Sequence, residues 1–166
     1  LWHNALTGDT IQPFFLDRLC NREWSNNCAD TSPTDHKQAY LATEFPYYYT
    51  DELYELTSTP NNLKSGIWIQ TANAEANNTD EQYIEFEVDR DVTVYIAYDN
   101  GASSLPNWLS SGFNSTGQTL QTNDPDSPVL RLYSQSYSAG LVELGGNLAT
   151  GANGANSNYV VIVKEQ

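Results

Sequence analysis

The sequence predicts an all-β protein, an antiparallel β-sandwich of jelly-roll-like type with an irregular N-terminal arm. Residues 45–166 contain eight short runs in which apolar and polar residues alternate, the pattern of strands with one buried face. Segments rich in Gly, Asn, Asp and Pro separate these runs at a spacing of about 8–12 residues, which is typical of antiparallel sandwiches. Eight strands suit a jelly roll, and 166 residues suit one domain. The predicted strands are residues 53–57, 66–71, 83–88, 92–98, 118–122, 129–134, 140–144 and 158–164.

The strongest strand signals lie in residues 83–88 and 92–98, on either side of the short turn 89–91. Every second residue in each run is apolar, so each strand has one apolar face and one polar face. We therefore predict that the two runs pair as a β-hairpin. Its inner face is formed by Ile84, Phe86, Val88, Val92, Val94 and Ile96.

Residues 1–44 differ from the rest, because they show little alternation and contain both cysteines and both histidines. This segment is too small to bury a core of its own, so we expect an irregular arm that packs on the sandwich module of residues 45–166. Cys20 and Cys28 close a short polar loop, which predicts a disulfide and an oxidising compartment. The alternative of a redox thiol site lacks a Cys-x-x-Cys motif.

The charge of the chain limits its partners. With 21 acidic and 7 basic residues, the formal net charge is −14, which opposes binding to nucleic acid or to anionic lipid. No run approaches the roughly 20 apolar residues needed to cross a bilayer, so we expect no membrane insertion. The chain has no Met and no leader-like run at Leu1, which indicates a processed or excised piece. We expect an acidic protein that is secreted or displayed on a cell surface.

Catalytic motifs are missing from the sequence, and we therefore predict that the protein is not an enzyme. There is no Gly-x-Ser-x-Gly, no His-Glu-x-x-His and no phosphate-binding glycine loop. Glu85 and Glu87 share one strand face, but such pairs typically provide solubility and protect a sheet edge. No cofactor is expected. Binding of a structural calcium ion is kept as an alternative, because the loops at residues 77–81 and 124–126 offer oxygen ligands. The sequence does not identify which of these residues would bind the ion.

Aromatic residues are the most informative group, with 4 Trp, 11 Tyr and 5 Phe. Burial is not expected for Trp68, which lies on the strand face opposite Ile67 and Ile69. It is not expected for Tyr98, which ends a strand beside polar residues, or for Trp108, which lies in a predicted loop at residues 105–109. Exposed rings beside amides and carboxylates suit sugars, which offer a C–H face for stacking and hydroxyls for hydrogen bonds. The alternative for Trp108 is a plug that closes one end of the sandwich. The predicted ligand-binding residues are Trp68, Asn73, Tyr98, Asp99, Trp108 and Asn147.

Five segments, residues 48–56, 66–73, 92–99, 106–109 and 139–147, carry a resemblance to a known kind of module. They include Tyr-Tyr-Thr-Asp, Gly-Ile-Trp-Ile-Gln-Thr-Ala-Asn and Leu-Gly-Gly-Asn, in this order. The stretch resembles a β-sandwich module of secreted and cell-surface bacterial proteins that is often appended to polysaccharide-active enzymes. The resemblance implies carbohydrate binding or adhesion.

Two functions follow as hypotheses. The first is a secreted, non-catalytic module that binds a polysaccharide through exposed aromatic and amide side chains. The second is a structural subunit of an extracellular filament or surface layer. In that case the arm and the tyrosines at 47–49 dock onto a neighbouring surface protein, and the chain forms a homo-oligomer or filament.

Overall fold

The computed structural model describes residues 47–166 in full and, before them, the backbone of four short strands. These early strands are β1 (Trp2–His3), β2 (Thr10–Ile11), β3 (Leu16–Asn21) and β4 (Lys37–Tyr40). The later strands are β5 (Leu56–Ser58), β6 (Ile67–Gln70), β7 (Ile84–Val88), β8 (Val92–Asp99), β9 (Asn114–Thr122), β10 (Val129–Tyr137), β11 (Gly140–Leu144) and β12 (Val160–Glu165). The helices are η1 (Asn61–Leu63) and η2 (Asn73–Asn77), both 3-10, and α1 (Asn107–Gly112).

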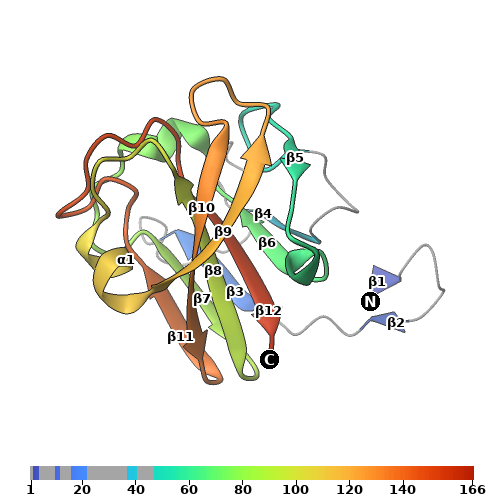
Figure 1. Ribbon diagram of the computed structural model, residues 1–166. Coiled ribbons are helices and arrows are strands. Elements are labelled where there is room, and N and C mark those ends of the chain that lie inside the picture. Colours follow the sequence, from blue (N-terminus) through green and yellow to red (C-terminus); the bar gives the residue numbers. More distant parts are fainter. Residues whose placement is uncertain (1, 4–9, 12–15, 22–36, 41–46) are drawn as a thin grey trace.

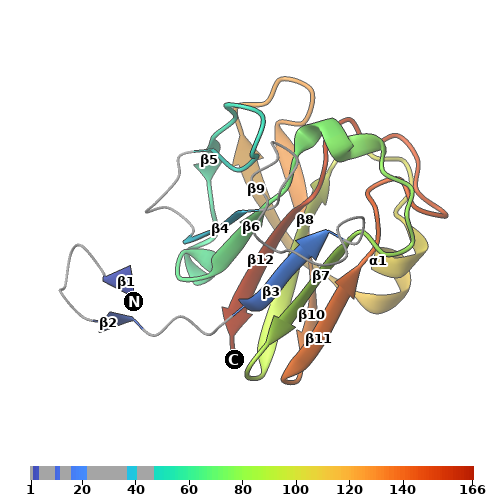
Figure 2. The same cartoon turned by 180° about the vertical axis from the view of Figure 1, so that it is seen from behind.

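Two sheets make up the body of the protein. The larger has seven strands in the order β4-β6-β12-β8-β10-β9-β5, and the smaller has three in the order β11-β7-β3. A separate pair, β1 and β2, forms a small ribbon. The larger sheet is in front in Figure 1, and in Figure 2 the strands β3, β7 and β11 lie in front of it. The named strands pair antiparallel, so the predicted all-β, antiparallel class is confirmed, and the two facing sheets are those of a sandwich.

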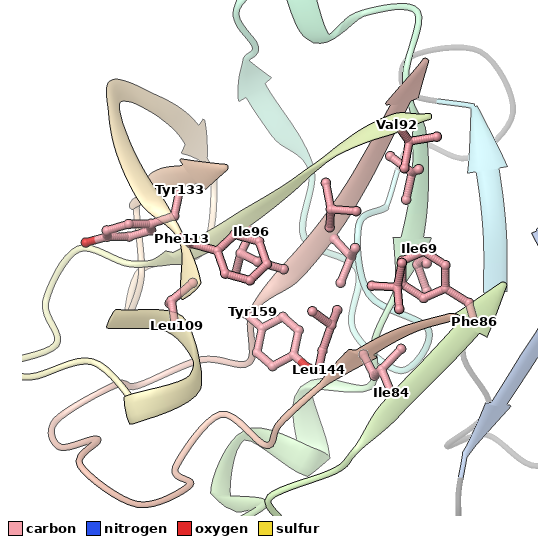
Figure 3. Packing of buried hydrophobic residues seen from close by; sticks show 14 of the residues in the cluster. Ile69, Ile84, Phe86, Val92, Ile96, Leu109, Phe113, Tyr133, Leu144 and Tyr159 are labelled. Atoms are coloured by element: carbon pink, nitrogen blue, oxygen red, sulfur yellow. The ribbon is translucent and has the colours of Figure 1, made fainter. Parts of the chain in front are cut away.

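The main hydrophobic core, which we call the inner core, lies between the two sheets. In Figure 3, Phe86 of β7 packs next to Ile69 of β6 from the opposite sheet. Alternate residues of each strand point inward, as the sequence pattern predicts, and their burial excludes water from the space between the sheets. Most members come from the strands: Ile67, Ile69, Ile84, Phe86, Val88, Val92, Val94, Ile96, Tyr98, Tyr133, Val142, Leu144, Val161 and Val163.

A second hydrophobic cluster, the outer core, lies on the other face of the seven-stranded sheet. It joins strand residues such as Trp68 and Ile162 to Leu63 of η1 and to Tyr48 and Tyr49. The segment from residue 47 to 66 therefore crosses this face and covers part of it. Gly66 makes the close approach feasible, because a Cβ atom there would lie 2.8 Å from Cγ2 of Ile162.

The predicted hairpin of residues 83–98 is wrong. β7 pairs with β11 and β3 in the small sheet, whereas β8 pairs with β10 and β12 in the large one. The turn 89–91 therefore carries the chain from one sheet to the other. The alternation was interpreted correctly, because the apolar residues of both strands do enter one core. Alternation alone does not distinguish a hairpin from a connection between facing sheets, since both arrangements bury the same residues.

Seven of the eight predicted strand segments overlap a strand along most of their length, although β9 begins before its predicted start and β10 continues past its predicted end. The exception is residues 53–57, which overlap β5 only at Leu56 and Thr57. Helix α1 was not predicted, because residues 105–109 were expected to form a loop. Among the described residues, no helix is long and apolar enough to span a bilayer.

The segment before residue 45 adds an edge strand to each sheet of the sandwich. β3 pairs with β7, where Leu19 lies opposite Phe86, and β4 pairs with β6. The boundary at residues 44 and 45 stays a prediction. Cys20 lies on β3 opposite Glu85, but Cys28 and every side chain before residue 47 lie outside the described residues. The disulfide therefore stays a prediction as well.

Candidate functional site

Trp68 and Tyr98 are not exposed, contrary to the expectation for both. Their exposed fractions are 2% and 0%. Trp68 belongs to the outer core, beneath the segment that crosses the sheet, while Tyr98 points into the inner core and donates a hydrogen bond to the Asn147 carbonyl at 2.7 Å. Burial, and then the nearby Asp99 carboxylate, raise the pKa of Tyr98 well above its usual value of 10. Neither ring face is accessible to a sugar.

Asp99 is also buried, with 4% of its surface exposed. Its carboxylate accepts hydrogen bonds from the Gly101 amide at 2.9 Å, the Ser127 hydroxyl at 2.8 Å and the Asn156 amide at 2.8 Å. These donors belong to three different loops at one end of the sandwich. Three donors compensate the carboxylate for lost hydration, so its role here is to join the loops.

The two predicted asparagines have similar structural roles. The Asn147 side-chain amide is buried and donates to the carbonyls of Ala76 at 2.8 Å and Ser157 at 3.0 Å. Asn73 is partly exposed, and its side-chain oxygen accepts from the Asn158 amide at 2.9 Å. Both side chains therefore hold neighbouring loops together, since each one satisfies a backbone group that would otherwise lack a partner.

Trp108 closes one end of the inner core, as the plug interpretation predicts. Its indole nitrogen donates to the Gly146 carbonyl at 3.0 Å, and its ring packs edge-to-face on Phe113 with centroids 5.9 Å apart. A Cβ atom at Gly145 would lie only 2.4 Å from Cδ1 of Trp108. The indole therefore requires glycine at position 145. The ring is half-buried and does not share a surface with Trp68 or Tyr98, whose rings are covered.

A different aromatic residue, Tyr95, lies on an open part of the sheet. On β8, Val94 and Ile96 point into the inner core, so Tyr95 between them points outward. Its ring packs on the outer core and is partly exposed. Alternation within residues 92–98 already places Tyr95 on the polar face, and this is the signal that could have identified it.

Exposure increases along the row of outward residues that contains Tyr95. Tyr95 lies opposite Ser134 of β10 on one side and Ile162 of β12 on the other, and residues in such pairs share a face. Beyond them, Ile162 lies opposite Trp68, and Ser134 lies opposite Asn114. The exposed fraction rises from the buried Trp68 and Ile162 through Tyr95 and Ser134 to the exposed Asn114. Tyr95 therefore stands where the outer core ends and the open sheet begins.

A second row of polar residues runs beside the first. Thr93 of β8 lies opposite Ser136 of β10 and Lys164 of β12. At the rim, Asn62 of η1 accepts hydrogen bonds from Lys164 and from Gln118 of β9. We call the two rows the Tyr95 face, and it consists of Thr93, Tyr95, Asn114, Ser134, Ser136 and Lys164.

The Tyr95 face contrasts in charge with the rest of the chain. None of its six residues is acidic, although the chain has 21 acidic residues. Its side chains offer hydroxyl, amide and ammonium groups around one aromatic ring. This set can stack on an apolar ring surface and can both donate and accept hydrogen bonds.

Glu85 and Glu87, the acidic residues considered for catalysis, lie on β7 of the three-stranded sheet and not on the Tyr95 face. Glu85 lies opposite Glu143 of β11, and Glu87 lies opposite Leu141. Glu85 and Glu143 are a like-charge pair on the outer side of the small sheet, where Gln82 also donates a hydrogen bond to Glu143. Directly opposed carboxylates destabilise a strand pair slightly. Glu143 lies on the edge strand β11, whereas Glu85 lies on β7, the central strand of this sheet.

Polar side chains in the two loops considered for calcium accept hydrogen bonds from nearby backbone amides, and Glu81 accepts hydrogen bonds from Thr150. Oδ1 of Asp124 accepts the Asp126 amide at 2.9 Å, and Oδ1 of Asn78 accepts the Asp80 amide at 2.9 Å. Such bonds are typical of turns. Within the described part of the chain, no group of three or more His, Cys, Asp or Glu side chains is arranged to hold a metal ion. Calcium binding stays a prediction.

The comparisons with known proteins identify a fold but no family. No family model and no curated protein matches the chain. Among solved structures, the chain is similar to part of a β-glucuronidase from glycoside hydrolase family 2, with a TM-score of 0.70 and 20% sequence identity. The match covers 81% of this chain and 14% of that chain. At this identity the likeness is one of fold, and it shows that a sandwich of this kind also occurs within a glycosidase.

Proposed function

We propose that this protein is a non-catalytic module that binds carbohydrate on the Tyr95 face. The observation that carries the proposal is a partly exposed tyrosine on an open sheet, surrounded by serine, threonine and asparagine side chains. A pyranose ring has an apolar face that stacks on such a ring, and its hydroxyl groups pair with neighbouring hydroxyls and amides. A polysaccharide repeats the same unit, so several weak contacts add along one chain.

The fold likeness supports a carbohydrate-related role, because the similar protein is named a β-glucuronidase. Two further features support binding without catalysis. The Tyr95 face has no carboxylate, whereas glycoside hydrolysis ordinarily needs a pair of them. It also has no histidine to act as a general base. We further propose that the protein acts outside the cell, with polysaccharide as its partner.

The alternative, a subunit of an extracellular filament or surface layer, depends on the N-terminal arm. The side chains of that arm lie outside the described residues. Of the tyrosines at 47–49, Tyr48 and Tyr49 are buried in the outer core and are not available to a neighbouring protein. This observation favours the carbohydrate proposal over the filament.

Affinity gel electrophoresis with a panel of neutral and acidic polysaccharides tests the proposal. The wild-type protein is expected to be retarded by at least one of them, and Tyr95→Ala is expected to weaken that binding about tenfold, which corresponds to about 1.4 kcal/mol. The matched control is Tyr137→Ala, because Tyr137 is also partly buried but packs against the inner core. This variant is expected to keep its retardation.

Circular dichroism checks that both variants remain folded. If Tyr95→Ala binds as well as the wild-type protein, the Tyr95 face is not the site. If no polysaccharide retards the wild-type protein, carbohydrate binding itself is wrong.

A further inference from the structure

Three of the four basic side chains in residues 47–166 have no acidic partner among the described residues: Lys64, Arg131 and Lys164. Arg90 forms ion pairs with Asp89 and Glu165, and these are the only ion pairs among the described residues. Arg131 donates to the side chain and the carbonyl of Asn100. Lys64 and Lys164 remain without a carboxylate partner, although the chain has three times as many acidic as basic residues.

Both lysines lie beside Asn62, at one end of the Tyr95 face. The Lys164 ammonium donates to the Asn62 carbonyl at 2.5 Å, and Lys64 follows η1 two residues after Asn62 and is exposed. An ammonium group has three N–H donors, so Lys164 has two more for a ligand. The Lys164 ammonium and the backbone of Lys64 therefore both lie next to η1.

Lys164 is also close to Tyr95. Tyr95 lies opposite Ile162, and Lys164 is two residues further along β12 on the same face. Such diagonal neighbours are separated by about 7–8 Å across a strand pair. A sugar stacked on Tyr95 therefore places its own substituents, or those of the next unit in the chain, within reach of the Lys164 ammonium.

We propose that this end of the Tyr95 face is a subsite for the carboxylate groups of an acidic polysaccharide, with Lys164 and Lys64 as its cationic ligands. This inference rests on the proposed function and names the class of glycan. Hydrogen bonds between an ammonium and a carboxylate are charge-assisted and stronger than those between neutral groups. The net charge of −14 repels polyanions from most of the surface, so binding of an acidic glycan requires a local cationic site of this kind.

The test compares three probes in the presence of a chelator, which prevents calcium from bridging the protein and the glycan. The probes are polygalacturonate, dextran sulfate and the neutral polysaccharide that binds best. The double variant Lys64→Gln/Lys164→Gln is expected to bind polygalacturonate about five- to tenfold more weakly than the wild-type protein, with neutral binding unchanged.

The matched control is Arg90→Gln/Arg131→Gln, which lowers the net charge by the same amount away from the Tyr95 face. It is expected to change polygalacturonate binding less than twofold. An equal loss in both double variants overturns the subsite, because it means that net charge alone sets the affinity. Dextran sulfate binding as tight as polygalacturonate binding also overturns it, since the site then does not select carboxylates.

The two proposals fail in different ways. If Tyr95→Ala loses neutral binding but the lysine variant binds polygalacturonate as the wild-type protein does, the subsite is wrong and the proposed function stands. If the wild-type protein binds none of the three probes, both proposals are wrong.

Discussion

The two faces of the seven-stranded sheet are covered to different extents. Its inner face lies against the three-stranded sheet, and every inward residue of β8, from Val92 to Tyr98, is buried. Its outer face is covered only in part, by the segment from residue 47 to 66 that forms the outer core. Beyond that segment the sheet is open, and Thr93 and Tyr95 are partly exposed.

Trp68 and Tyr95 show how the partial cover of the outer face determines which of its side chains are buried. Both are outward-pointing aromatic residues in one row across the sheet, separated by Ile162. Trp68 is buried because Leu63 and its neighbours lie over it, whereas Tyr95 lies past the edge of this cover. Alternation decides which face a side chain takes, but a segment far away in sequence decides whether that face meets water.

The largest expected effect comes from the inner face. Phe86→Ala removes a fully buried ring between the two sheets and should lower the free energy of unfolding by about 3–5 kcal/mol. Tyr95→Ala on the outer face should lower it by only about 1 kcal/mol, since part of that ring is already in water. Urea denaturation followed by circular dichroism measures both. Equal losses in the two variants would show that the two faces do not differ as described.

Covering the outer face depends on a glycine. Gly66→Ala would place a Cβ atom 2.8 Å from Cγ2 of Ile162 and 3.1 Å from the Leu63 carbonyl oxygen, so the covering segment or the sheet must shift. We expect a loss of about 1–3 kcal/mol, the usual cost of overpacking, measured by urea denaturation. Gly112→Ala is the control, because its Cβ would meet only the flexible side chain of Gln135. A Gly66→Ala protein as stable as wild type would mean that the segment does not pack closely on the sheet.

Much of the fold was predictable from the sequence, because strands obey a local rule. Alternation identified the inward residues of β7 and β8 correctly, and turn-forming residues marked most of the strand ends. The pairing of β7 and β8 was not predictable in the same way. Whether two successive strands pair or face each other depends on their other neighbours, here β11, β10 and β12, which are distant in sequence.

The candidate site was less predictable, for the same physical reason. Trp68 was assigned to the surface because it alternates with Ile67 and Ile69, and that assignment omitted the cover from residues 47–66. Tyr98 and Asp99 were assigned to a ligand because they end a strand beside polar residues, but loops from elsewhere in the chain enclose them. Local sequence predicted the face of Tyr95 correctly, because nothing covers it completely.

The smallest effect concerns the hydroxyl of Tyr98, which is buried in the inner core. Tyr98→Phe removes its hydrogen bond to Asn147 and should cost about 1 kcal/mol at neutral pH. The pKa of Tyr98 is raised in the folded protein by burial and by Asp99, so above pH 10 the unfolded chain loses this proton first. Wild-type stability therefore falls with rising pH, by up to about 1.4 kcal/mol per pH unit from this group alone, whereas the variant lacks this loss. The urea midpoints of the two proteins, measured at pH 8 and between pH 10 and 11.5, should converge above pH 10 and then cross. If the two curves stay parallel instead, the Tyr98 hydroxyl is hydrated in the folded protein. The inner core near Tyr98 is then less well shielded from water than the outer core is near Trp68.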